Sequence, residues 1–86
     1  MERLIMPAKA VVRLNFSSDK QLHVVMQALK PEIESSSTNR SNVSMCAEGQ
    51  SLVLHFKATD TSALRAAMNS YLRLVGVAMK LQKFSE

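Results

Sequence analysis

The stretch Thr59-Asp60-Thr61-Ser62-Ala63-Leu64-Arg65-Ala66-Ala67-Met68-Asn69-Ser70-Tyr71-Leu72-Arg73 decides the fold of this 86-residue chain. Thr59, Asp60 and Thr61 can each act as an N-cap, because their side-chain oxygens accept hydrogen bonds from the free amides of a first helical turn. Strong helix formers follow, without a proline as far as the C-terminus. The stretch therefore opens a helix over about residues 61–84, which is some 36 Å long at about 1.5 Å per residue.

Hydrophobic residues lie on two sides of this predicted helix. At about 100° per residue, one side carries the stripe expected to pack in the core: Leu64, Ala67, Met68, Tyr71, Val75, Ala78 and Met79. A second cluster lies nearly opposite and consists of Leu74, Val77, Leu81 and Phe84. One small core covers only one of these stripes. The second stripe therefore predicts a contact with another protein.

The first half of the chain predicts a strand followed by a helix. After a loose lead-in over residues 1–7, hydrophobic residues alternate with polar ones over 8–16, as in a strand with one buried face. Ser18 and Gln21 have the spacing of a capping box. Leu22, Val25, Met26 and Leu29 then recur at helical spacing, and they predict a helix over 19–30 that Pro31 ends. A polar connection is expected over residues 31–39.

Two further strands are predicted over residues 40–47 and 51–58, joined by a hairpin turn at Glu48-Gly49-Gln50. Gly49 can supply the positive φ that such a turn needs. The order β-α-β-β-α predicts a single α+β domain over residues 1–86: a three-stranded antiparallel sheet with two helices packed on one face. On the outer face of the first helix, Val24 and Ala28 are expected to join Leu74, Val77 and Leu81 in one hydrophobic patch.

The size of the chain and the outer face of the sheet both predict a homodimer. A chain of 86 residues buries only about 60–65% of its unfolded surface and needs further stabilisation. One cysteine and two histidines give neither an intrachain disulfide nor a four-ligand zinc site. Oligomerisation is the remaining way to stabilise a chain of this size. The outer sheet face has few charges and is the expected dimer interface, formed by Val11, Arg13, Ser44, Cys46, Val53 and His55.

Composition and motifs give no sign of catalysis. We expect no cofactor and no enzymatic activity, because no acid–base pair or nucleophile set can be assembled, and two glycines cannot form a phosphate-binding loop. The net charge of +4 is consistent with simple solubility or with contact to phosphates. Cys46 is expected to be packed or hidden. A single cysteine suits the cytoplasm, and neither a signal peptide nor a membrane span is expected.

The segments 60–66 and 69–73 resemble the signature of the small dimerising subunit of the KEOPS complex, in its archaeal form. Lys30-Pro31-Glu32 and Asn39-Arg40-Ser41 resemble that family's loop and the entry to its second strand. The resemblance implies the same β-α-β-β-α fold and a noncatalytic role. It also implies a homodimer that docks the threonylcarbamoyl transferase subunit on its two helices, with a kinase and a fourth subunit bound indirectly. That complex forms threonylcarbamoyladenosine in tRNA.

The predicted long helix also carries a polar ridge whose role stays open. Arg65, Asn69 and Arg73 are spaced by four residues, and Lys80 and Lys83 follow on the same helix. The residues alone fit a solvated face, whereas the resemblance favours contact with a partner or with tRNA. Gly76 either permits close approach of another helix or only weakens this one. An alternative function is a free-standing small RNA-binding module, which would depend on lysines and arginines rather than on the hydrophobic stripe.

Overall fold

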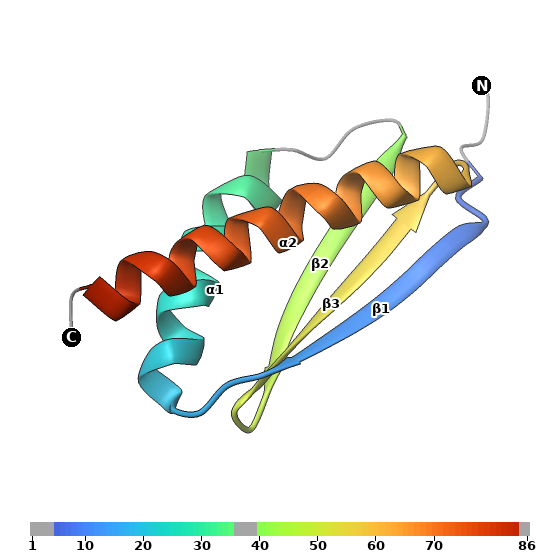
Figure 1. Cartoon of the computed structure of the whole chain (residues 1–86). Coiled ribbons are helices and arrows are strands. Elements are labelled where there is room, and N and C mark those ends of the chain that lie inside the picture. The colour runs from blue at the N-terminus through green and yellow to red at the C-terminus, as the bar shows by residue number, and fades with distance from the viewer. Residues whose placement is uncertain (1–4, 36–39, 85–86) are drawn as a thin grey trace.

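The computed structural model describes residues 5–35 and 40–84, with side chains as far as Leu81. Five elements follow one another: β1 (Ala8–Asn15), α1 (Asp19–Ser35), β2 (Ser41–Glu48), β3 (Ser51–Ala58) and α2 (Thr61–Phe84). This confirms the α+β class and the predicted order, and Figure 1 shows both helices on one side of the sheet. Within the described ranges, no helix is long and apolar enough to cross a membrane.

The three strands form an antiparallel sheet in the order β1-β3-β2. β3 is central, and its Leu54 lies between Val12 of β1 and Met45 of β2. A two-residue turn joins β2 to β3. Gly49 has a φ of 62° there, which is the left-handed conformation that glycine adopts without steric cost. β1 and β2 each leave one edge unpaired within the described sheet.

The core lies between the inner face of the sheet and the two helices. Leu52, Leu54, Phe56 and Ala58 of β3 are fully buried or nearly so. They meet Tyr71, Val75 and Ala78 of α2 and the buried residues of α1, which are Leu22, Val25 and Leu29. The rings of Phe56 and Tyr71 pack edge to face, with their centroids 5.9 Å apart. The buried stripe that the spacing in α2 predicts is confirmed.

The prediction that Pro31 ends the first helix is wrong, because α1 continues to Ser35 with Pro31 inside it. A proline there removes one hydrogen bond to the preceding turn. Two interactions favour the added turn. Ile33 packs against the core, and the Ser35 hydroxyl donates a hydrogen bond to the Pro31 carbonyl oxygen at 2.8 Å. The rest of the predicted polar connection, residues 36–39, lies outside the described residues.

Capping residues fix the start of each helix. At α1, the backbone N–H of Gln21 donates to the Ser18 hydroxyl at 3.1 Å. The Gln21 side-chain oxygen accepts from the backbone N–H of Ser17, one residue earlier than in the usual capping box. At α2, Asp60 is the N-cap among the three candidates, because its carboxylate accepts from the backbone N–H of Ala63 at 2.8 Å.

Candidate interaction surfaces

The start of α2 is held against the start of β2, which fixes the direction of the long helix across the sheet. The backbone N–H of Thr59 donates to the Arg40 carbonyl oxygen at 2.9 Å. The Arg40 guanidinium lies 3.7 Å from the Asp60 carboxylate, so the capping residue is also part of an exposed ion pair. With its origin fixed in this way, α2 presents different side chains to the sheet, to α1 and to solvent.

The first candidate surface lies on the outer side of the two helices, and we call it the helix-pair surface (Val24, Ala28, Leu74, Val77 and Leu81). α1 packs mainly against α2, as the predicted patch requires. Val77 and Leu81 are 50% and 65% exposed. Ala28 is exposed and Val24 half-buried.

Leu74 differs from the prediction for the helix-pair surface. It is half-buried and packs against the core, because it lies on the flank of α2 that approaches the buried residues. The exposed hydrophobic part of this surface is therefore formed chiefly by Val77 and Leu81. The side chains of Lys83 and Phe84 lie outside the described part of the chain.

The second candidate surface is the outer face of the sheet, which was predicted as the dimer interface. Arg13, Ser44, Cys46 and His55 are exposed there, and Val11 is 63% exposed. The exposure of Cys46 contradicts the expectation of a packed or hidden thiol. Val53, in contrast, is only 4% exposed although it faces away from the helices.

Polar side chains cover Val53 within the single chain. Arg13 and Cys46 are its neighbours across the two strand pairs. Arg13 forms an ion pair with Glu48, and this contact spans β3 from one edge strand to the other. Lys9 and Lys57 are also paired on this face. The outer face therefore carries more charge than its six predicted residues alone suggest.

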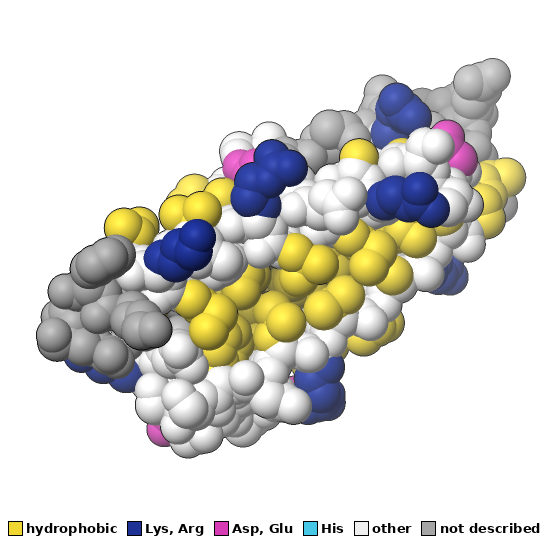
Figure 2. Space-filling model, viewed as in Figure 1, with side chains coloured by type: hydrophobic (Ala, Val, Ile, Leu, Met, Phe, Trp, Pro, Cys, Tyr) yellow, Lys and Arg dark blue, Asp and Glu magenta, His cyan; other side chains and the backbone are white. Residues whose placement is uncertain are grey.

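A third surface, which the sequence reasoning missed, lies between α2 and β1. Figure 2 shows a continuous hydrophobic area along the side of α2, over the region where Figure 1 places β1. The half-buried hydrophobic residues of β1 are Ala10, Val12 and Leu14. On α2, Leu64, Met68 and Leu72 line a hollow of about 230 Å³. We call these six residues the α2–β1 groove.

The groove was missed because alternation shows which side of a strand faces the helices but not how far the helices extend. Ala10, Val12 and Leu14 have the inward phase of core residues. α1 packs mainly against α2, and this leaves the β1 side of the sheet covered only by the flank of α2. Leu72 is the signal that the sequence did offer, since it lies beside the core stripe of α2 and is 39% exposed.

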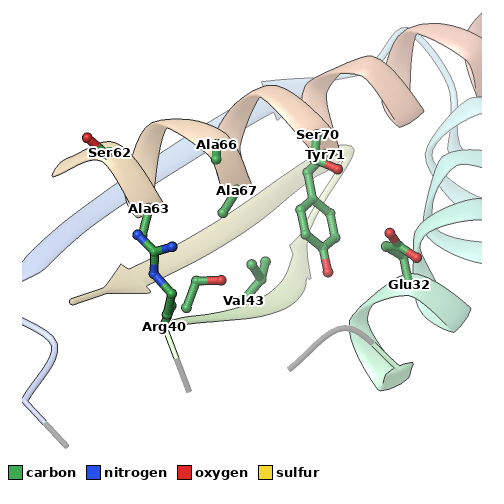
Figure 3. A pocket seen from close by; sticks show the side chains of 10 residues that line it. Glu32, Arg40, Val43, Ser62, Ala63, Ala66, Ala67, Ser70 and Tyr71 are labelled. Carbon is green, nitrogen blue, oxygen red and sulfur yellow. The ribbon is translucent and has the colours of Figure 1, made fainter. Parts of the chain in front are cut away.

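A second hollow, of about 510 Å³, lies on the opposite side of α2, between this helix, β2 and the end of α1. Figure 3 shows Arg40 at one end and Glu32 at the other, with Tyr71 between them. Its polar lining is completed by serine hydroxyls, and its floor is formed by small residues such as Ala67. In the part of the chain that is described, no three His, Cys, Asp or Glu residues are close enough together to hold a metal ion.

The solvent side of α2 carries the predicted polar ridge. Arg65, Asn69, Arg73 and Lys80 are all exposed and lie opposite the buried Tyr71 around the helix. The ion pairs that the structure shows among the described residues involve Arg13 and Arg40, not the ridge. Figure 2 shows the basic side chains at intervals along α2, and we call Arg65, Arg73 and Lys80 the basic ridge.

A small α+β domain with two exposed hydrophobic surfaces and a basic ridge has the architecture of a protein-interaction domain. The chain belongs to the Pcc1 family, whose model, described as "Transcription factor Pcc1", matches residues 9–83. It is 38% identical over 66 residues to the "KEOPS complex subunit Pcc1" of Pyrococcus abyssi (strain GE5 / Orsay), covering 77% of this chain and 80% of that protein. This confirms the family resemblance.

The fold is also similar to that of a chain in the crystal structure of the binary complex Gon7-Pcc1. The TM-score is 0.83, and the match covers 95% of this chain and all of the other. The sequence identity is 13%, so this similarity concerns the fold alone.

Proposed function

We propose that this chain is a noncatalytic scaffold subunit of a KEOPS complex and that it holds the threonylcarbamoyl transferase subunit on its helix-pair surface. Its membership of the Pcc1 family and its similarity to the Pyrococcus abyssi KEOPS subunit support the role in the complex. The observation that carries the location is the exposure of Val77 and Leu81 on α2, the helix against which α1 packs. Two helices with a hydrophobic seam of this kind accept helices from another protein.

In this proposal the kinase and the fourth subunit bind indirectly, and tRNA binds through the assembled complex. This chain binds the transferase subunit and positions it in the complex. The formation of threonylcarbamoyladenosine takes place in the transferase. The core of an interface is more hydrophobic than its rim, and Val77 and Leu81 are the exposed residues of the helix-pair surface that a partner would bury.

We also propose that the scaffold is a homodimer, and that the second copy occupies the α2–β1 groove. β1 contributes Ala10, Val12 and Leu14 to the groove, and its edge away from β3 is unpaired within the described sheet. Two copies related by a twofold axis can pair their β1 edges antiparallel, and in the same movement bury Leu64, Met68 and Leu72. The sequence-predicted outer face remains the rival interface. Lys9 and Lys57 disfavour it, because two copies stacked there would bring like charges together.

The transferase contact is tested by Val77→Glu in co-purification of the two subunits. Glutamate keeps or improves helix propensity at this exposed position, so the fold should persist. A desolvated carboxylate in the interface should weaken binding by more than about a hundredfold. The matched control is Val11→Glu, the same change at an exposed valine on the outer face of the sheet, outside both the helix-pair surface and the groove.

The expected result is that Val77→Glu loses the transferase and that Val11→Glu retains it, with normal circular dichroism in both variants. Full retention of the transferase by a folded Val77→Glu protein would overturn the assignment of the helix-pair surface.

The alternative of a free-standing small RNA-binding module is favoured by one observation. α2 carries exposed arginines and a lysine, and it contains no acidic residue. This alternative predicts that a purified preparation of the chain binds nucleic acid tightly at physiological salt, with no partner present. In the scaffold proposal, the isolated chain binds only weakly under these conditions.

A further inference from the structure

β2 is an edge strand that lacks the features by which edge strands usually avoid pairing with other chains. Between Ser41 and Ala47 it contains no charged residue and no proline, and its register with β3 runs without a bulge. Charged side chains, prolines and bulges are the common means of preventing such pairing. β2 can therefore accept a further strand along its free edge.

The hydrogen-bonding groups of this edge follow from the pairing of β2 with β3. At the start of that ladder, the backbone N–H of Thr59 donates to the Arg40 carbonyl oxygen, so these two residues form a hydrogen-bonded pair. In an antiparallel ladder, such pairs alternate with pairs whose backbone groups point away from the partner strand. Counted from Arg40, the N–H and C=O groups of Val43 and Met45 point away from β3. They are the donors and acceptors that an added strand would use.

The hollow of about 510 Å³ lies beside this edge, on the inner side of the sheet, and Val43 is part of its lining. Figure 3 shows Val43 between Arg40 and Glu32, with Ala67 of α2 above it. Side chains alternate along a strand, so every second side chain of an added strand would face the hollow. The hollow shares no residue with the helix-pair surface or with the α2–β1 groove, so it is a separate site.

The unbalanced charge in the hollow is negative. Arg40, at one end, lies 3.7 Å from the Asp60 carboxylate. Glu32, at the other end, is half-buried and takes part in neither of the ion pairs found among the described residues. It also lies in the last turn of α1, where the helix dipole is negative and no basic residue is present. A basic side chain in the hollow would meet this carboxylate and lay its aliphatic stem over Val43 and Ala67.

We propose that the free edge of β2 binds an extended segment of another protein, and that this segment places an arginine or lysine side chain in the hollow beside Glu32. The backbone of the segment pairs with Val43 and Met45, which gives affinity, and the basic side chain gives selectivity. The added strand runs antiparallel to β2, because antiparallel pairing is the more stable arrangement. The proposal does not depend on the proposed function, since it uses none of the surfaces assigned there.

The test uses the full-length chain and two fluorescein-labelled synthetic peptides. In the first, Thr-Val-Thr-Arg-Thr-Val-Thr, the arginine and both valines lie on one face of an extended strand. In the second, glutamate replaces the arginine. Fluorescence anisotropy should show roughly tenfold tighter binding of the arginine peptide, because its guanidinium forms a charge-assisted hydrogen bond with the carboxylate.

This preference should disappear in the variant Glu32→Gln. The matched control is Glu34→Gln, which removes the same charge from an exposed position two residues later and should keep the preference. A second measurement is amide hydrogen exchange of the wild-type chain, followed by NMR. The backbone N–H groups of Val43 and Met45 should exchange more slowly when the arginine peptide is bound, whatever the two variants do to stability.

The proposal would be overturned if neither peptide bound at about millimolar protein concentration, or if the two variants reduced the preference equally. Unchanged exchange at Val43 and Met45, or slower exchange along β1 instead, would also contradict it. If these two amides became protected in the chain alone as its concentration rose, a second copy rather than another protein would occupy the edge, and the proposal would be wrong.

Discussion

The two faces of the three-stranded sheet exclude water by different means. On the inner face, helices cover Leu54, which is completely buried. On the outer face, the adjacent Val53 is 4% exposed, although no helix covers it, because the Arg13–Glu48 ion pair crosses β3 on that side. Yet the inner face also leaves the α2–β1 groove open. The exposed hydrophobic surface thus lies mainly on the side of the core, whereas on the charged outer face Val53 is covered and Val11 is exposed.

The largest effect of a substitution is expected on the oligomeric state. Leu72→Glu places a charge in the α2–β1 groove, whereas Val11→Glu places the same charge on the outer face at a position 63% exposed. We expect Leu72→Glu to dissociate the dimer, at a cost of several kcal/mol, and Val11→Glu to leave it intact. Analytical ultracentrifugation of both variants distinguishes the interfaces. The opposite outcome, a monomeric Val11→Glu and a dimeric Leu72→Glu, would assign the dimer to the outer face.

The next largest effect is expected on the free energy of unfolding, at a buried residue of the inner sheet face. Leu54→Ala removes a fully buried side chain at the centre of β3 and leaves a cavity between the sheet and α2. The free energy of unfolding should fall by about 2–5 kcal/mol. Urea denaturation followed by circular dichroism measures this loss. A change below about 1 kcal/mol would show that the site collapses around the smaller side chain and that the helices pack loosely on the sheet.

A smaller effect is expected at the adjacent residue on the outer face. Val53→Ala should lower the free energy of unfolding by about 1–2 kcal/mol, because two methyl groups are lost beneath the half-exposed side chains of Arg13 and Glu48. Val53→Asp is no clean test of dimerisation, since the position is buried within one chain and a charge there would unfold it. If Val53→Ala cost as much as Leu54→Ala in urea, the outer face would be packed as tightly as the core, most simply by a second copy.

The smallest effect concerns Gly76, whose role the sequence left open. An added Cβ meets nothing within the chain, and the residue is exposed in the middle of α2. Gly76→Ala should therefore raise the free energy of unfolding by up to about 1 kcal/mol, through helix propensity alone. Thermal denaturation checks this. A destabilised variant would mean that Gly76 packs against another protein chain, such as a second copy of this one.

Much of this architecture could be predicted from the sequence, because local rules agree with the fold. The alternation in β1 and β3, Gly49 in the turn and the spacing in α2 all specify their elements independently. Pro31 misled because the helix continues past it, with Ile33 packed against the core and the Ser35 hydroxyl hydrogen-bonded to the Pro31 carbonyl oxygen. Leu74 misled because a helical projection does not show where the neighbouring helix lies.

The interaction surfaces were less predictable than the fold, for the same physical reason. Periodicity identifies which residues face inward, but exposure depends on how far each helix extends over the sheet. The α2–β1 groove and the cover over Val53 both arise from such placement, across strands that are far apart in sequence. The basic ridge, in contrast, lies on a single helix, and the spacing of Arg65, Asn69 and Arg73 showed it directly.

The central claim is that this small chain works as a dimeric scaffold, and the mass of the purified protein in solution tests it most directly. Multi-angle light scattering at micromolar concentration should give twice the 9.5 kDa of one chain. The thermal midpoint should also rise with protein concentration, as it does when association stabilises the fold. A folded protein that stays at 9.5 kDa over this concentration range would contradict the account.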